Sequence, residues 1–219
     1  MQKDRNAPPI SRRQILMLAL AGLPPLMLPY AIQAQAQPSS SAEQALKLVE
    51  AARAQIGQTL YYNGAYERLD YPNGDIPIER GVCTDVIIRA YRKAFNFDLQ
   101  KAIHEDMRRN FSAYPNNWGA KTTDRNIDHR RVPNQQAFFK RQGTALTVTQ
   151  SASDFLAGDI VSHMLPGNLP HILIVSDRKN SSGTPLAIHN IGRGTQEENI
   201  LFNYQITGHY RFFPEQSNL

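Results

Sequence analysis

The 219-residue sequence contains a single cysteine, Cys83. With no second cysteine the chain cannot form an intrachain disulfide, and it cannot supply a zinc site that is rich in thiolates. The sequence also lacks a tight metal-binding motif such as His-Glu-x-x-His, and it has no internal repeat. We therefore predict neither a metal site nor any other cofactor.

Residues 1–36 have the layout of an export signal. A basic start that contains Arg12-Arg13 is followed by an apolar stretch and by small residues up to Ala36. The paired arginines resemble the twin-arginine export motif. Three prolines interrupt the apolar stretch, which leaves it short of the roughly 20 apolar residues that a membrane span needs. We predict cleavage after Ala36, no stable membrane span after cleavage, and a periplasmic or secreted protein.

Most of the positive charge lies in this predicted signal. The whole chain has a formal net charge of +5, whereas residues 37–219 carry 20 basic and 18 acidic side chains, a net charge of +2. Nucleic-acid binding thereby loses its main compositional support. After a polar linker at 37–44, residues 45–215 have a length that suits one domain. Nothing in the pattern specifies an oligomeric state.

Helical spacing comes first along this domain and strand patterns follow. Helices are predicted from the start of the domain to Gly57 and at residues 83–95, 98–114 and 133–143, with a long loop at 61–81. Short β-branched and aromatic runs follow at 145–149, 158–165, 170–178, 186–192 and 205–213. This order predicts an α+β fold with N-terminal helices packed on a C-terminal antiparallel sheet.

Cys83 is predicted to lie in the first turn of the 83–95 helix. Unpaired N–H groups and the helix dipole favour a thiolate there, so we expect the thiol pKa to be lowered, as a nucleophile requires. The alternative is a buried structural cysteine that acts as a small hydrophobic residue. Asp85 is expected to steady the helix start and to pair with Arg89.

A cysteine nucleophile needs a base and a group that orients this base. His171 and His189 lie on consecutive predicted strands, so a hairpin can place both on one face as neighbours. We predict His171 as the base and His189 as the orienting residue. Asn190, on the opposite face, is the alternative for the orienting role.

The order of these motifs resembles the NlpC-like branch of the papain-like cysteine peptidases and amidases. The matching stretches are the cysteine at a helix start, "GDIV" at 158–161, the strand that begins with His171, and the following "IHN". The resemblance implies a papain-like fold and a catalytic triad of Cys83, His171 and His189. It also implies that Tyr61 or Tyr62 lies beside the site. Val82-Cys83-Thr84 departs from the usual Asp-Cys-Ser.

Longer stretches are similar to a bacterial domain-of-unknown-function family typified by YijF. They include "YPNGDIPIERGVCTDVIIRAYR", "NIDHRRVPNQQAFF", "HNIGRGTQEENILF" and "ITGHYRF", and together they cover nearly all of residues 45–213.

Export and the papain-like resemblance together imply a cysteine hydrolase, an amidase or endopeptidase, that cuts an amide bond in cell-wall peptidoglycan peptides. Arg130 and Arg131 are predicted to bind a substrate carboxylate. Two alternatives stay open. One is a non-catalytic cell-wall-binding domain of the same fold, and the other is a thiol acyltransferase or peptidase that acts on another exported peptide.

Overall fold

The computed structural model describes residues 40–215, so the predicted signal at 1–36 lies outside the described residues. The α-helices are α1 (Ser41–Arg53), α2 (Cys83–Phe95), α3 (Leu99–Arg109) and α4 (Val132–Arg141). Three short 3-10 turns, η1 (Phe111–Ala113), η2 (Asp128–Arg130) and η3 (Ala152–Asp154), lie between the larger elements. Over the described range, no helix is both long and apolar enough to cross a membrane.

The strands form one larger sheet and one small parallel pair. The pair consists of β1 (Tyr61–Tyr62) and β2 (Arg80–Gly81). The larger sheet contains β3 (Ile160–Leu165), β4 (Leu169–Lys179), β5 (Pro185–Asn190), β6 (Thr195–Glu198) and β7 (Gln205–Tyr210). Its order is β6-β5-β4-β3-β7, and every neighbouring pair is antiparallel. This arrangement confirms the predicted α+β class.

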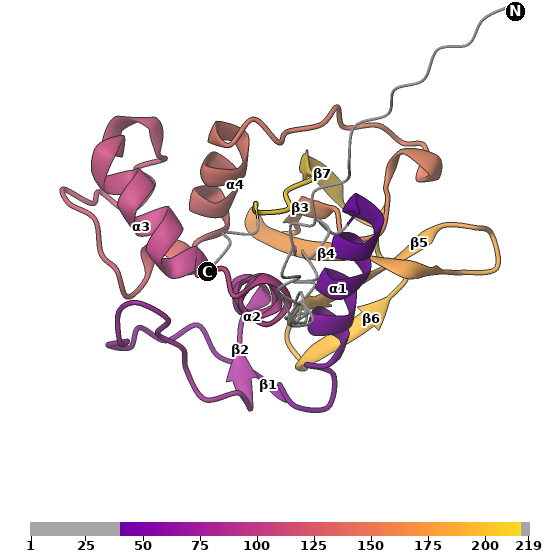
Figure 1. Cartoon of the computed structure of the whole chain (residues 1–219), viewed down its shortest axis with the longest axis horizontal. Coiled ribbons are helices and arrows are strands. Elements are labelled where there is room, and N and C mark those ends of the chain that lie inside the picture. Colours follow the sequence, from indigo (N-terminus) through magenta and orange to yellow (C-terminus); the bar gives the residue numbers. More distant parts are fainter. Residues whose placement is uncertain (1–39, 216–219) are drawn as a thin grey trace, which may run out of the picture. The chain divides into compact units, whose positions relative to one another are not determined.

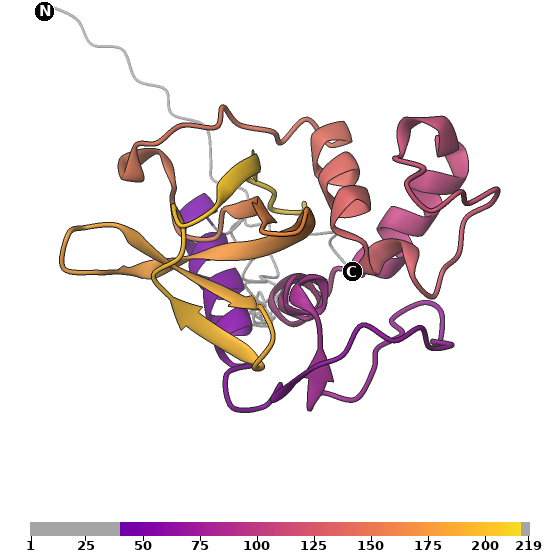
Figure 2. The ribbon, with the colours of Figure 1, turned by 180° about the vertical axis from the view of Figure 1, so that it is seen from behind.

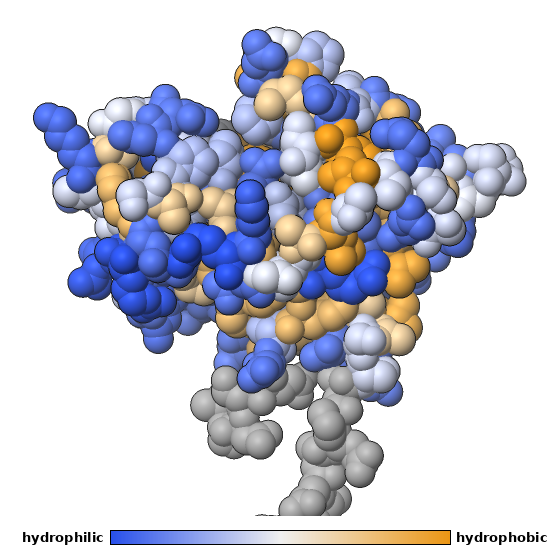
Figure 3. All heavy atoms as spheres, turned by 90° about the horizontal axis from the view of Figure 1, so that it is seen from above, coloured by the Kyte–Doolittle hydropathy of each residue, from blue (hydrophilic) through white to orange (hydrophobic). Residues whose placement is uncertain are grey.

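Each face of the sheet is covered by a separate apolar cluster. On one face, Ile172 and Ile174 of β4 pack with residues of α1, α2 and α4, and both ribbon views show these helices against the sheet (Figure 1, Figure 2). On the other face, Leu173 and Val175 pack under loop residues such as Phe155. The alternation of side chains along a strand therefore separates two cores. Figure 3 shows that the surface seen from above is largely hydrophilic around a limited hydrophobic patch.

Local signals set several element bounds. Helix α2 has the predicted bounds, and Asn96 ends it in the left-handed conformation. Helix α1 begins at Ser41, inside the segment that we assigned to the linker, because Ser40 and Glu43 form a capping box. The strand predicted at 145–149 is wrong, since only Ala145 forms an isolated bridge there. Strand β6 was not predicted.

The "GD" before β3 has a structural role. Gly158 has a φ of +81°, and a Cβ there would meet Ala45 Cα at 3.0 Å, so only glycine lets α1 approach this closely. Asp159 is fully buried and accepts hydrogen bonds from His209 Nε2 at 2.7 Å and from Arg211 Nε at 2.7 Å. The carboxylate thus fixes the end of β7 to the start of β3.

Replacing Asp159 with alanine leaves His209 and Arg211 without this acceptor. We expect the Asp159→Ala variant to lose about 3 kcal/mol of unfolding free energy, measured by urea denaturation, because one partner of a buried charge cluster is removed. Asp154→Ala changes an exposed aspartate nearby and should stay within about 0.5 kcal/mol of the parent. Equal losses in the two variants would contradict the proposed role of Asp159.

Candidate active site

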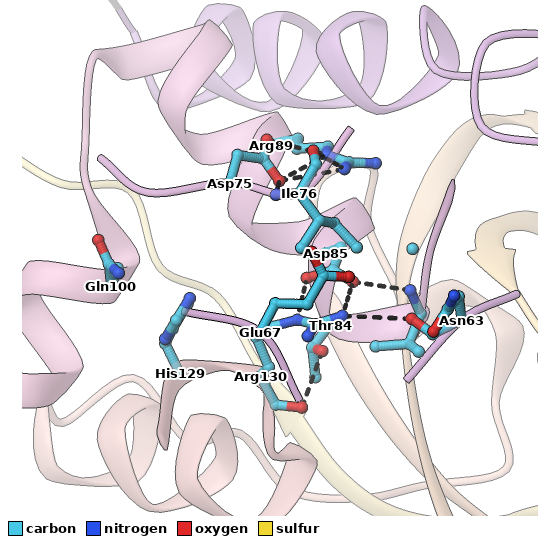
Figure 4. Close-up of polar contacts among 12 residues, drawn as sticks. Asn63, Glu67, Asp75, Ile76, Thr84, Asp85, Arg89, Gln100, His129 and Arg130 are labelled. Carbon is cyan, nitrogen blue, oxygen red and sulfur yellow. Dashed lines mark hydrogen bonds and ion pairs between the residues drawn. The ribbon is translucent and has the colours of Figure 1, made fainter. Parts of the chain in front are cut away.

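The start of α2 is fixed by a buried ion pair. Val82 N–H donates to Asp85 Oδ2 at 2.7 Å, which confirms that Asp85 steadies the helix start. The expected pairing of Asp85 with Arg89 is wrong. Asp85 instead binds Nε and Nη2 of Arg130, each at 2.9 Å, while Arg89 binds Asp75 (Figure 4).

Arg130 also holds the loop that leads from β1. Its Nη1 donates to Ala65 O at 3.1 Å and its Nη2 to Asn63 O at 3.3 Å, as the dashed contact at Asn63 in Figure 4 illustrates. Thr84 Oγ1 donates in turn to the carbonyl of Arg130 at 3.0 Å. The guanidinium is therefore committed to internal partners, and of the two predicted carboxylate-binding arginines only Arg131 has room for a ligand.

The Cys83 thiol is buried, with 3% of the residue exposed. Burial, assisted by the charge of Asp85, raises the pKa of the thiol to about 12. Backbone hydrogen bonds from Ile172, Thr84 and Cys83 itself oppose this shift without cancelling it. The expectation of a lowered pKa is therefore wrong. The helix start does supply N–H donors, but desolvation of the sulfur outweighs them.

The two predicted histidines are brought together. His171 Nε2 lies 3.2 Å from His189 Nδ1, with the rings edge to face. His189 Nε2 lies 3.1 Å from Glu198 Oε2, and Arg193 pairs with the other oxygen of Glu198. Burial is the main factor that lowers the pKa of both histidines, to about 3 for His171. Both rings are therefore neutral at physiological pH.

Cys83 and His171 lie on different faces of β4. The Cys83 sulfur accepts a hydrogen bond from the backbone of Ile172 and packs in the cluster on the helix-covered face, whereas the side chain of His171 shares the other face with Leu173. The structure therefore does not bring the predicted nucleophile to the predicted base. The pairing of β4 with β5 begins only at Ile174, so no β5 backbone pairs with this part of β4. Within residues 40–215, Cys83 and His171 make no hydrogen bond to each other, and His171 Nδ1 has no hydrogen-bond partner.

Within the described residues, Asn190 makes no hydrogen bond to His171. Its Nδ2 donates to Gly81 O at 3.0 Å, and its Oδ1 accepts from Gly192 N–H. These bonds tie β5 to the segment directly before Cys83. Of the two candidates for the orienting role, the structure therefore brings only His189 to His171.

A cavity of about 230 Å³ opens beside Cys83. Its lining includes Tyr62, Trp118, Arg131 and Pro170, and the Arg131 guanidinium lies 4.1 Å from the centre of the Trp118 ring. Burial and the nearby Cys83 raise the pKa of Tyr62 to about 12, so its hydroxyl stays protonated. Tyr61 does not line the cavity and is 65% exposed. Of the two predicted tyrosines, only Tyr62 lies at the site.

No metal cluster lies at this site or elsewhere in the described part of the chain, where no three His, Cys, Asp or Glu residues are grouped to hold an ion. The cavity therefore combines a thiol with an aromatic and cationic wall, and a histidine pair with a carboxylate lies on the other face of β4. These groups are the types that acyl transfer through a sulfur nucleophile uses, but that chemistry needs the thiol and the base within reach of each other.

Residues 49–212 match the family model described as a domain of unknown function, DUF1287. The chain belongs to the DUF1287 family. Among curated proteins, the "Uncharacterized protein YijF" of Escherichia coli K12 is 50% identical over 189 residues, which are 86% of this chain and 89% of YijF. No solved structure matches the chain. The predicted membership in a YijF-typified family is confirmed, and the papain-like resemblance stays a prediction for this DUF1287 protein.

Sequence reasoning missed two residues at the site. Glu198 lies on β6, which is only four residues long, but the pattern Gln196-Glu197-Glu198 after the turn at "GRG" could have suggested a strand that faces His189. Trp118 lies in an irregular segment, and its only signal was its rarity.

The raised thiol pKa predicts how Cys83 reacts with iodoacetamide. In the folded protein the alkylation rate should be low near neutral pH and rise about tenfold per pH unit up to about pH 9, because the thiolate fraction grows with pH below the thiol pKa. Mass spectrometry of timed samples measures the rate. The urea-unfolded protein is the control, and its rate should level off above an ordinary thiol pKa of about 8.5. A folded-state rate already maximal at about pH 6 would contradict the raised pKa.

Proposed function

We propose that this DUF1287 protein is an exported cysteine hydrolase, an amidase or endopeptidase of papain-like fold, that cleaves an amide bond in cell-wall peptidoglycan peptides. The observation that carries the proposal is the placement of Cys83 at the start of α2 in the wall of a cavity and against β4, the strand that also carries a His171 held by His189. A nucleophile, a base and an orienting group from three different elements are the parts that acyl transfer requires.

In the proposed reaction, the Cys83 sulfur attacks the amide carbonyl carbon and its proton passes to His171 Nδ1. This transfer requires the two side chains, which lie on different faces of β4, to come within hydrogen-bond reach of each other. The neutral thiol and the neutral imidazole mean that proton transfer accompanies attack, because no thiolate–imidazolium pair exists beforehand. His171 then gives the proton to the leaving amine as the C–N bond breaks. Water hydrolyses the thioester and restores the thiol. The Cys83 N–H at the helix start is available to the oxyanion.

The cavity supports a substrate that carries a free carboxylate. Arg131 is 20% exposed in its side chain, and its guanidinium is stacked on Trp118 beside the thiol. Stacking holds the guanidinium flat, and since its Nη1 pairs with Asp128 Oδ1 only at 3.6 Å, a substrate carboxylate could compete for its donors. Stem peptides of the bacterial wall carry such carboxylates, and the predicted signal at 1–36 would deliver the protein to that compartment.

One observation favours the non-catalytic cell-wall-binding alternative: the Cys83 thiol is neutral and makes no hydrogen bond to a histidine in the described chain. If this alternative holds, Cys83 is a core residue, and the cavity binds a cell-wall ligand without catalysing a reaction. The acyltransferase alternative keeps the same thioester and replaces water with an amine from another exported peptide.

Cys83→Ser and His171→Gln should each abolish hydrolysis of purified peptidoglycan or of defined stem peptides, with products read by mass spectrometry. The physical reason is that one removes the sulfur nucleophile and the other the base. His104→Gln, a change away from the cavity, is the matched control and should keep the parent rate. Circular dichroism checks that each variant is folded. If the parent and Cys83→Ser release the same products, or if the parent releases none, the hydrolase proposal fails.

Arg131→Gln should remove the preference for substrates with a free carboxylate. We expect kcat/KM for a carboxylate-bearing peptide to fall about 10- to 100-fold, the worth of a hydrogen bond to a charged group, and kcat/KM for its amidated counterpart to change little. Arg125→Gln is the control, since Arg125 stacks on Tyr71 and does not line the cavity. An equal fall for both peptides would assign Arg131 a structural role instead.

A further inference from the structure

We propose that Glu198 is a positioning residue that fixes where the protons sit on His189 and His171, and that it thereby leaves His171 Nδ1 as the unprotonated base nitrogen. This inference rests on the proposed function and adds a fourth member to the predicted triad. It follows from the two short contacts that run from β6 across β5 to β4.

The first step is the carboxylate. Glu198 Oε2 lies 3.1 Å from His189 Nε2, and its other oxygen pairs with the Arg193 guanidinium. An ionised carboxylate only accepts hydrogen bonds. His189 Nε2 must therefore carry a proton and donate it to Glu198.

The second step is the neutrality of the rings. His189 and His171 are buried, and burial disfavours a second proton on either imidazole. A neutral imidazole with a proton on Nε2 has a lone pair on Nδ1. His189 Nδ1 is therefore an acceptor, and the 3.2 Å contact requires His171 Nε2 to donate. Two nitrogens then carry no proton, and since His189 Nδ1 is occupied as an acceptor, His171 Nδ1 is the one whose lone pair stays available.

The opposite tautomer of either ring does not fit. A proton on His171 Nδ1 would leave Nε2 with a lone pair that faces the lone pair of His189 Nδ1. A proton on His189 Nδ1 would leave Nε2 with a lone pair against the carboxylate. Each arrangement replaces a hydrogen bond between buried groups with a repulsion, so the charge of Glu198 is transmitted through both rings.

Glu198→Gln tests this transmission. Arg193 donates hydrogen bonds and therefore retains the amide oxygen, so the amide NH₂ faces His189 Nε2. Because the amide NH₂ donates where the carboxylate accepted, the tautomers of both His189 and His171 should reverse. Histidine tautomers are read from long-range ¹H–¹⁵N spectra of ¹⁵N-histidine protein. We expect Nε2–H on His171 and His189 in the parent and Nδ1–H on both in Glu198→Gln. An unchanged His171 tautomer in a folded Glu198→Gln variant would overturn the proposal.

Glu197→Gln is the matched control, because Glu197 is the preceding residue of β6 and binds Arg53 and Arg178 on the other face. It should lower stability without changing either tautomer. If Glu198→Gln does not fold, Glu198→Ala serves instead. Added acetate should restore the parent tautomers there, and a failure of acetate to shift them would count against the role.

Activity gives a second readout. If the parent hydrolyses its substrate, Glu198→Gln should lower kcat about 100-fold or more with little change in KM, because the base nitrogen is blocked while the cavity is intact. An unchanged kcat would overturn the positioning role. If the parent hydrolyses nothing, the proposed function fails on its own, and the tautomer spectra still decide the role of Glu198.

Discussion

The buried ion pair between Asp85 and Arg130 is the interaction on which the candidate site depends. Their side chains are 4% and 2% exposed, so each would be costly to bury alone. Arg130 also donates hydrogen bonds to the Asn63 and Ala65 carbonyls, and Asp85 also accepts one from Val82 N–H at the start of α2. Because every member needs the others, the helix start, the loop after β1 and the η2 segment cannot separate. Cys83 lies at this helix start, and Tyr62 and Arg131 directly adjoin the other two segments, so one ion pair helps to assemble the thiol and the wall of its cavity.

Local patterns were enough to predict much of the fold. Helix α2 and four of the five larger strands carry their signals within a few neighbouring residues, as apolar spacing, Gly and Asn. The predictions that failed concern segments and side chains whose structure depends on partners distant in the sequence. Residues 145–149 have strand composition but no neighbouring strand beyond one bridge, while the four polar residues of β6 form a strand only because β5 is there to pair with them. Asp85 met Arg130 rather than Arg89 for the same reason, since Arg89 found Asp75.

The predictions for the candidate site succeeded and failed for the same reasons. Strand alternation and a short hairpin placed His171 beside His189 correctly, because both follow from sequence spacing. The pKa of Cys83 did not follow, since the helix dipole can be read from the position but the degree of burial cannot. The carboxylate beyond the histidines was missed along with β6. Sequence therefore predicted the meeting of two side chains on neighbouring strands, and it failed for Cys83 and His171, for Asp85 and Arg89, and for the pKa that burial sets.

The desolvation that keeps Cys83 neutral bears on how one unpaired cysteine could persist if the protein is exported, as we propose. Oxidants and disulfides react with thiolates that are accessible, and Cys83 is neither ionised at neutral pH nor open to solvent. A carbonyl that entered the cavity would change this balance, because its developing oxyanion would face the helix start while the proton moved to His171. Ionisation would then be coupled to the presence of substrate. The same burial that makes the thiol unreactive at rest is what a protected nucleophile would need.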